Sequence, residues 1–436
     1  MKTTILSQIS KLLIQIIISS FIIFSCKMPA LHNPSDPFSD EYGKNVLLSE
    51  LIRYWLRDKI VPDGLIVAVS KSAVPYESGF RIYRVDPDIG VTTEYDSDIR
   101  SANVNAFPGC QPVRVSVAPN SRDIITFTGS ASDHIVTHRY GTDRSLNLLK
   151  DEFYSGVIPS MVAFSSDSST MYVTDFSNPN KVQRLNRDLT SGSTSLGNGS
   201  GYPFSVGCAP ISIKTSQLDN LVFAVSSSYL PIGIYSFKNT GSDSGAITSG
   251  SPYNSGSNPS QQNNLCISEY DRFLYMTSVN GTNPIYGVRY DSEGNMTALP
   301  NSPFSPDSGF TAPTSNTNYA TSLAIDPQNK YLAYLYSAGG TFYIRLLVID
   351  KSSGNLIPTD QKVSVGNSPM HLDWDKSGKF IYLISDTGGT TNKFQIEYFK
   401  FTYDGKLTKG INSPITIGAM SSDFTPRHIT SIPRYY

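Results

Sequence analysis

The 436-residue sequence predicts an all-β fold, a seven-bladed β-propeller closed by a C-terminal strand and preceded by a short N-terminal helix. Three observations predict it. Strand-favouring aromatics are abundant, with 26 Tyr and 21 Phe, while 32 Gly and 27 Pro supply turn residues. A strand–turn–strand pattern recurs along the chain. The two ends of the chain carry complementary parts of one further repeat.

Six complete repeats are visible. Each begins with a short alternating apolar strand, continues through a polar turn with Asp, Asn or Gly, and resumes in a second apolar strand with aromatics. The first apolar residues of these repeats are Val115, Val162, Ile213, Leu265, Leu323 and Leu372. One propeller blade has four strands in about 50 residues, and the separation between successive first apolar residues matches that length.

The seventh repeat is divided between the two ends of the chain. Residues 65–70 and 81–85 match the second and third strands of a blade, and Pro426–Ile432 matches a first strand alone. Joining them closes the ring and removes the unpaired strand edges of an open one. A β-sandwich array or a β-helix would explain the repeat but not the split unit. We therefore assign residues 65–436 to the propeller.

The first 25 residues predict a signal peptide, because Lys2 and Lys11 precede a short apolar run. Ser25-Cys26 resembles the lipobox of bacterial lipoproteins, and the bulky residues before it resemble spirochaete lipoboxes. Cleavage would leave Cys26 to carry acyl chains such as palmitate. Residues 26–45 then form a flexible tether, and residues 46–64 show an amphipathic helical pattern. An ordinary secreted protein or an uncleaved anchor remains the alternative.

A lipid anchor places the protein in a bacterial cell envelope, at the outer membrane or the periplasmic face. The formal net charge of −1 argues against a nucleic-acid partner, which calls for a basic surface. We expect a monomer without a cofactor. Loops rich in Ser, Gly and Asn at 190–201, 249–264 and 305–319 are candidate contact surfaces for a protein or glycan partner.

A blade signature recurs in the second half of the chain. Ser268–Thr277 and Ile285–Tyr290 are followed by Gly294–Leu299 and Ser302-Pro303-Phe304, and the Ser-Pro element returns at Ser251-Pro252-Tyr253 and Ser413-Pro414-Ile415. Over residues 65–433 the sequence resembles the lactonase family of propellers, which includes bacterial 6-phosphogluconolactonase and fungal muconate-lactonising enzymes. The resemblance implies the propeller fold and, as an expectation, hydrolysis of a lactone at the central channel.

Family enzymes carry His-Pro-His and Gly-Pro-Arg-His motifs, and the matching blades here read Ile158-Pro159-Ser160-Met161 and Asn258-Pro259-Ser260. Parts of the motifs stand instead at Pro369-Met370-His371 and Pro426-Arg427-His428. The leading interpretation is therefore a membrane-anchored extracytoplasmic lipoprotein whose propeller is a binding and interaction scaffold. The alternative is a carboxylic ester hydrolase that opens a lactone.

Residues just before each first strand should ring one mouth of the channel. By repeat position they are Arg114, Met161, Ser212, Asn264, Ser322, His371 and His428, with Arg427 beside the last. Ring closure would gather Arg114, His371, Arg427 and His428 on one arc. Imidazole can activate water and guanidinium can bind a carboxylate, so these four are candidates for binding a small anion or for catalysis. The alternative is that they hydrogen-bond the backbone around a water-filled channel.

The remaining cysteines and histidines predict no metal site. Cys110 and Cys208 occupy equivalent positions two blades apart, which disfavours a disulfide between them, and Cys266 is the third remaining cysteine. The state of these three cysteines stays open. His134 and His138 lie on one face of an expected strand, and we predict that this face is a solvated edge.

Overall fold

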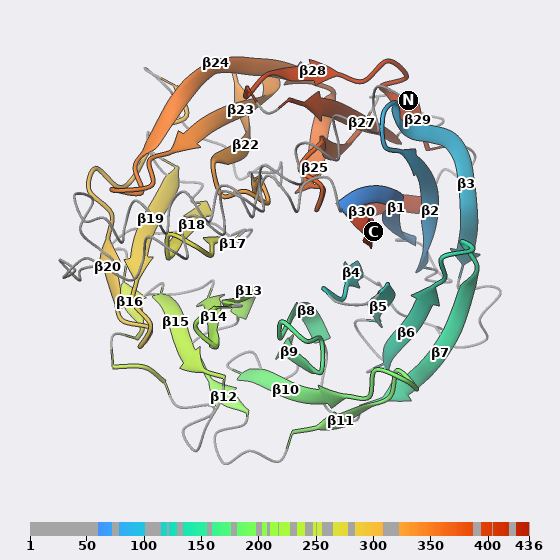
Figure 1. The fold of residues 1–436 in the computed structure, drawn as a ribbon, viewed down its shortest axis with the longest axis horizontal. Coiled ribbons are helices and arrows are strands. Elements are labelled where there is room, and N and C mark those ends of the chain that lie inside the picture. The colour runs from blue at the N-terminus through green and yellow to red at the C-terminus, as the bar shows by residue number, and fades with distance from the viewer. Residues whose placement is uncertain are drawn as a thin grey trace, which may run out of the picture. The chain divides into compact units, whose positions relative to one another are not determined.

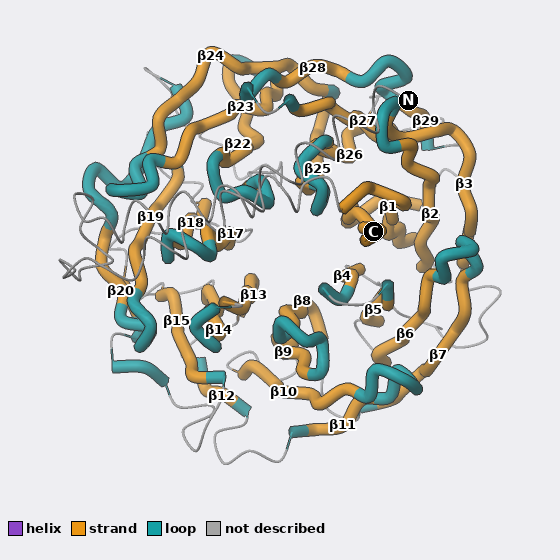
Figure 2. The backbone as a smooth tube through the Cα atoms, in the orientation of Figure 1, coloured by secondary structure: helices purple, strands orange, loops and turns teal. Residues whose placement is uncertain are grey.

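The computed structural model describes residues 60–435, which belong to the unit Arg57–Tyr436, with gaps in this range. The gaps are 72–77, 101–114, 120–121, 129–133, 155–158, 176–180, 198–202, 207–209, 217, 227–232, 240–246, 250, 255–264, 278–283, 308–321, 387–393, 403 and 418–423. Strands β1 to β30 are the regular structure of this part, and no helix occurs in it (Figure 2). Accordingly, none of the described segments is a helix that could cross a membrane.

The strands form seven antiparallel sheets arranged as the blades of a ring (Figure 1). Blade 1 holds β4 (Val115–Val117), β5 (Asp123–Thr128), β6 (His134–Tyr140) and β7 (Leu146–Phe153). Blade 2 holds β8 (Pro159–Phe164), β9 (Thr170–Asp175), β10 (Lys181–Arg187), β11 (Thr194–Leu196) and β12 (Phe204–Ser205). Blade 3 holds β13 (Pro210–Ser216), β14 (Leu221–Ser226), β15 (Gly233–Lys238) and β16 (Tyr253–Asn254).

The other half of the ring repeats the pattern. Blade 4 holds β17 (Leu265–Ser268), β18 (Phe273–Thr277), β19 (Ile285–Tyr290) and β20 (Met296–Ala298). Blade 5 holds β21 (Ser322–Ile325), β22 (Tyr331–Ala338), β23 (Thr341–Ile349) and β24 (Leu356–Val365). Blade 6 holds β25 (Asn367–Trp374), β26 (Phe380–Asp386), β27 (Phe394–Phe401), β28 (Leu407–Lys409) and β29 (Ile415–Thr416).

Blade 7 is built from both ends of the propeller, which confirms the predicted closure. β1 (Ile60–Lys71), β2 (Ser78–Asp86) and β3 (Gly90–Arg100) supply its outer strands, and β30 (Phe424–Tyr435) supplies the innermost one. β30 pairs antiparallel with β1 from Ile60–Tyr435 to Lys71–Phe424. The two strands lie side by side at the centre of the ring (Figure 1).

The boundary predicted at residue 65 is too late. Residues 60–64, assigned from sequence to the helical segment, belong to β1, because β30 runs on to Tyr435 and extends the pairing. The remainder of that segment lies outside the described residues, as do the signal peptide, Cys26 and the tether.

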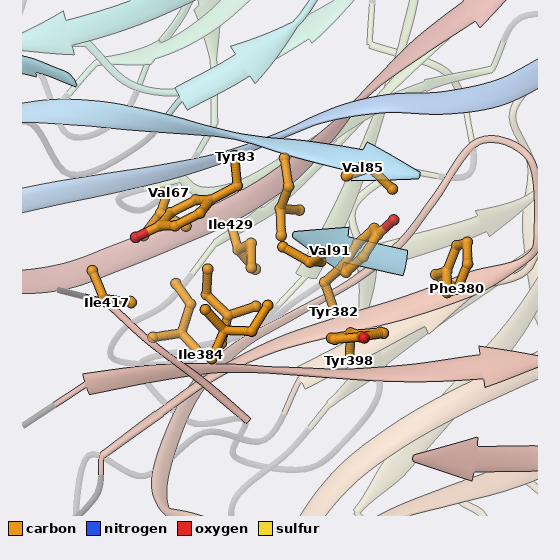
Figure 3. Packing of buried hydrophobic residues seen from close by; sticks show 13 residues of the cluster. Val67, Tyr83, Val85, Val91, Phe380, Tyr382, Ile384, Tyr398, Ile417 and Ile429 are labelled. Atoms are coloured by element: carbon orange, nitrogen blue, oxygen red, sulfur yellow. The ribbon is translucent and has the colours of Figure 1, made fainter. Parts of the chain in front are cut away.

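The hydrophobic core is divided among the blade interfaces. The buried apolar side chains of the described residues gather in seven clusters, and each cluster joins two neighbouring blades. Between blades 6 and 7, Tyr382 and Tyr398 pack with Val67, Tyr83 and Ile429 (Figure 3). Because apolar burial drives folding, every blade depends on both of its neighbours and the ring is stabilised as a whole.

The recurrent Ser-Pro element has a structural role. The hydroxyl oxygens of Ser251, Ser302 and Ser413 accept hydrogen bonds from the backbone N–H groups of Ser236, Gly287 and Tyr398, at 3.0, 2.9 and 3.0 Å. Each bond ties the segment after the third strand back to that strand and satisfies a backbone donor. The signature that carries the family resemblance is therefore a feature of blade construction.

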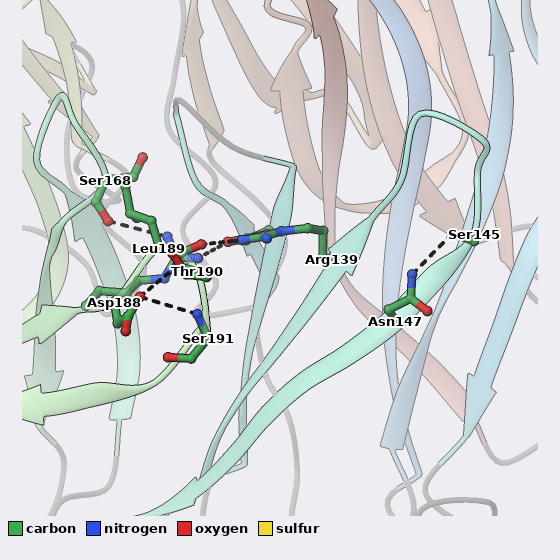
Figure 4. A network of polar contacts seen from close by, with 10 residues as sticks. Arg139, Ser145, Asn147, Ser168, Asp188, Leu189, Thr190 and Ser191 are labelled. Atoms are coloured by element: carbon green, nitrogen blue, oxygen red, sulfur yellow. Dashed lines mark hydrogen bonds and ion pairs between the residues drawn. The ribbon is translucent and has the colours of Figure 1, made fainter.

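Blades 1 and 2 are also joined by buried charges. The carboxylate of Asp123, fully buried, accepts bonds from Arg139 at 2.6 and 2.9 Å and from Arg187 of blade 2. Arg139 donates as well to the carbonyl of Leu189 at 2.5 Å (Figure 4). Desolvation by burial lowers the pKa of Arg187, whereas the hydrogen bonds from Arg139 to Asp123 raise the pKa of Arg139. Removing one member would leave an uncompensated buried charge.

The prediction of a solvated edge at His138 is wrong. Its side chain is 5% exposed, and its ring packs edge-on against Phe80 of blade 7, with ring centroids 5.4 Å apart. Burial lowers the pKa of His138 to about 4. The face that alternation assigned to solvent is covered, because this side of blade 1 packs against blade 7.

Candidate functional site at the ring centre

Two of the four predicted site residues lie together. His371 on β25 of blade 6 and His428 on β30 of blade 7 have ring centroids 4.0 Å apart and ring planes inclined by 37°. Both side chains are partly exposed. Arg114 lies outside the described residues, and Arg427 belongs to β30 but its side chain lies outside them too. The structure thus brings two imidazoles together where the ring closes.

At two other blades the residue predicted at this mouth hydrogen-bonds the backbone. Ser212 and Ser322 are buried, and their hydroxyl oxygens accept hydrogen bonds from the backbone N–H groups of Leu265 and Leu372, at 3.2 and 3.3 Å. Each serine therefore links the first strand of its own blade to the first strand of the next. Met161 packs against the core cluster of blades 2 and 3, and Asn264 lies outside the described residues.

A second layer of side chains lies two residues further along the same strands. By repeat position it comprises Ser116, Ala163, Lys214, Cys266, Ala324, Asp373 and Thr430. Residues two apart on a strand share a face and are separated by about 7 Å, so Asp373 follows His371 and Thr430 follows His428. The carboxylate of Asp373 accepts hydrogen bonds from the backbone N–H of Ser431, at 3.1 Å, and from the hydroxyl of Thr430. Blade 7 therefore holds Asp373 in place.

Two lysines act electrostatically on Asp373. Lys214 lies on β13 of blade 3, and Lys376 lies in the turn after β25 of blade 6. β13 and β25 lie on different sides of the ring centre (Figure 1), so Lys214 acts on Asp373 and Lys376 from across it. Both lysine side chains are solvent-accessible. The surrounding protein nevertheless removes enough bulk water to lower the pKa of Lys376 and to raise that of Asp373.

Cys266 of this layer is not a nucleophile at neutral pH. Its thiol is buried and donates to the carbonyl of Leu323 at 3.2 Å. Burial raises its pKa to about 11, and the thiolate is the reactive form. Cys110 and Cys208 lie outside the described residues. Within the described ranges, no three His, Cys, Asp or Glu side chains gather in a way that could hold a metal ion.

Sequence reasoning found the histidine pair and missed the charged layer. The predicted channel residues precede the first apolar residue of each blade, whereas Lys214 and Asp373 stand one position after it. The same repeat alignment, read two residues further, would have shown a lysine and an aspartate at equivalent positions facing the axis.

Solved structures share this architecture. The putative 6-phosphogluconolactonase from Bacteroides fragilis superposes with a TM-score of 0.57 at 14% identity, over 85% of this chain and 98% of that one. The periplasmic gluconolactonase of Pseudomonas aeruginosa superposes with a TM-score of 0.59 at 15% identity, over 84% and 99%. The fold is that of the lactonase propellers.

A putative 6-phosphogluconolactonase from Bacteroides uniformis gives the same result, with a TM-score of 0.59 at 13% identity over 85% of this chain and 100% of that one. No protein-family model matches the sequence, and no curated protein matches it either. At these identities the likeness concerns the fold, so the chemistry of the ring centre has to be argued from its own residues.

Proposed function

We propose that this protein is a lipid-anchored, extracytoplasmic propeller that binds a small anionic ligand beside His371 and His428. The observation that carries the proposal is the contact between these two partly exposed imidazoles, at 4.0 Å, on neighbouring innermost strands. Imidazole offers a donor and an acceptor when neutral and two donors when protonated. Two imidazolium rings this close repel each other, so an anion that offsets their charge is the favoured class of ligand.

Binding is tested with the protein lacking residues 1–26 and ¹³C-labelled at histidine. Acetate, gluconate and phosphate are titrated separately while the imidazole resonances are followed. We expect one of these anions to shift the resonances of His371 and His428, and His371→Ala and His428→Ala to weaken its binding at least tenfold. His134→Ala, on the third strand of blade 1, serves as the matched control. The proposal is refuted if an anion shifts the histidine resonances equally in all variants, or if no anion shifts them.

Anchoring at Cys26 is a separate part of the proposal, supported by the apolar leader and the Ser25-Cys26 pair. It places the propeller in the bacterial cell envelope, where the segments 190–201, 249–264 and 305–319, apart from strands β11 and β16 inside the first two, would be available to a protein or glycan partner. Cells expressing the full chain should incorporate a palmitate analogue into it, and Cys26→Ala should abolish the label. Labelling that persists in Cys26→Ala would overturn the anchor without touching the ligand site.

Hydrolysis of a lactone is the second candidate, favoured by the imidazole pair within the fold of the lactonase propellers. One neutral imidazole would take a proton from water as its oxygen bonds to the lactone carbonyl carbon. The ring C–O bond then breaks, the proton passes to the leaving alkoxide, and a hydroxy acid is released. Turnover of a lactone panel that disappears in both alanine variants would establish this reaction. Binding without turnover would leave the protein a binding propeller.

A further inference from the structure

We propose that Asp373 is the positioning residue of the histidine pair, because its carboxyl group links the innermost strands of blades 6 and 7 and leaves the channel-mouth position to His371. The channel-mouth position is the residue directly before the first apolar residue of each blade. The purpose of this arrangement rests on the proposed function, in which His371 and His428 contact the ligand. The arrangement itself rests on hydrogen bonds between the innermost strands.

Neighbouring innermost strands belong to different sheets, so no backbone ladder sets their register. Apolar contact between blades is non-directional, whereas a hydrogen bond fixes how far one strand is shifted along the next. Between blades 3 and 4, the hydroxyl oxygen of Ser212 accepts from the N–H of Leu265. Between blades 5 and 6, the hydroxyl oxygen of Ser322 accepts from the N–H of Leu372. Each link joins a channel-mouth residue to the first apolar residue of the next blade.

At the junction of blades 6 and 7 the corresponding link is made two residues further along both strands. By equivalence it would run from Ile429 to the channel-mouth residue of blade 6, but that residue is His371. The bond observed runs instead from the N–H of Ser431 to the carboxyl group of Asp373, at 3.1 Å. Residues two apart on a strand share a face, so these two residues are the next pair in line. The imidazole of His371 can therefore stand at the mouth, with its ring centroid 4.0 Å from that of His428.

The donor and the acceptor both suit a fixed link. Ser431 is 3% exposed, so its backbone N–H requires a partner inside the protein. Burial raises the pKa of Asp373, but a carboxyl oxygen accepts this hydrogen bond in either protonation state. Asp373 lies two residues beyond His371, and Ser431 lies three residues beyond His428. The bond therefore fixes the height of one imidazole relative to the other along the channel.

The contact between the imidazoles gives a measurement that needs no ligand. In the protein lacking residues 1–26, the ring protons of His371 and His428 should show a nuclear Overhauser effect, because the rings are in contact. Asp373→Ala should abolish this effect. It should also weaken anion binding by about tenfold, because a pair that is no longer pre-organised has to be ordered on binding.

Two variants are expected to keep the histidine contact. Asp373→Asn retains an acceptor for the N–H of Ser431 and removes the charge, so it should preserve both the contact and anion binding. Ser212→Ala removes the equivalent link between blades 3 and 4 and serves as the matched control. Loss of the contact in Asp373→Asn would show that the charge acts rather than the hydrogen bond, and would overturn the proposal.

A double variant keeps the test decisive where Asp373→Ala alone does not fold. His371→Ser with Asp373→Ala places a serine at the channel mouth, as in blades 3 and 5, where its hydroxyl can accept from the N–H of Ile429. The urea midpoint of unfolding should fall in Asp373→Ala, and the double variant should recover about half of that loss or more.

The outcomes separate this proposal from the proposed function. A histidine contact that persists in Asp373→Ala, or that is absent from wild-type protein, would overturn the positioning role, as would a double variant no more stable than Asp373→Ala. If no anion binds but the contact is lost in Asp373→Ala alone, the proposed function fails and Asp373 still positions the pair.

Discussion

His138 offers the sharpest test of how the blades pack. Its pKa is lowered to about 4 by burial against blade 7, while the unfolded chain has the ordinary value of 6.5. The folded state therefore holds fewer protons than the unfolded state between these values. The stability that this group contributes is fully present above pH 6.5 and is lost as the pH falls through 4. From pH 7.5 to pH 5.0 the loss works out at about 2 kcal/mol.

Urea unfolding of wild-type protein and of His138→Leu at both pH values measures this loss. The difference between the two proteins isolates His138, because other groups titrate in both. Asp375 is one such group. Burial raises its pKa to about 7, so its protonation stabilises the folded state as the pH falls. We expect the free energy of unfolding of wild-type protein, relative to His138→Leu, to decrease by about 2 kcal/mol between pH 7.5 and 5.0.

Phe80→Leu is the matched control, because it removes the ring contact and keeps the histidine. It should lower stability by a similar amount at both pH values. If the wild-type and His138→Leu proteins differ by the same free energy at pH 7.5 and 5.0, the imidazole is not desolvated and the reasoning fails. An NMR titration of His138 with a midpoint near 6.5 would refute it directly.

Three further outcomes follow from the packing and the charges. Ile432→Ala, in the fully buried cluster between blades 7 and 1, should lower the free energy of unfolding by about 2–5 kcal/mol in urea, whereas an unchanged midpoint would contradict a packed closure. Arg187→Met should cost about 3–5 kcal/mol by the same measurement because Asp123 stays buried, and a loss below about 1 kcal/mol would mean that Arg139 alone compensates that charge. With all other cysteines replaced by serine, Cys266 should react with a thiol reagent at pH 8 only after unfolding, and rapid labelling of native protein would show that the layer around it opens.

The repeat made most of the fold predictable. The spacing of Val115, Val162 and their equivalents predicts the blade length. The incomplete repeats at the two ends of the chain predict that the ring is closed. Strand β30 lies where Pro426–Ile432 predicted it, because only a first strand was missing from the N-terminal fragment. The start of β1 was placed late, since Pro62 and Asp63 resemble a turn and only the length of β30 shows that pairing continues.

The environment of single side chains was less predictable. Alternation assigns residues to the two faces of a strand, but both faces of a propeller blade are covered by neighbouring blades, so His138 is buried on the face assigned to solvent. Ser212 and Ser322 have the positions expected of channel residues, yet the register between blades places a backbone N–H against each hydroxyl. The contact between His371 and His428 was predictable because ring closure makes their two blades neighbours.

The division of blade 7 between the chain ends also fixes when the ring can form during synthesis. Ile60 and Tyr435 are paired neighbours in space and stand at opposite ends of the propeller sequence. Contacts of such long sequence separation carry a large loop-closure entropy and form late. Until the last strand leaves the ribosome, β1 has an open edge and two of the interface clusters lack β30 side chains, Ile429 and Ile432. The nascent propeller must therefore be kept from pairing with other chains until the twelve residues of β30 have been made.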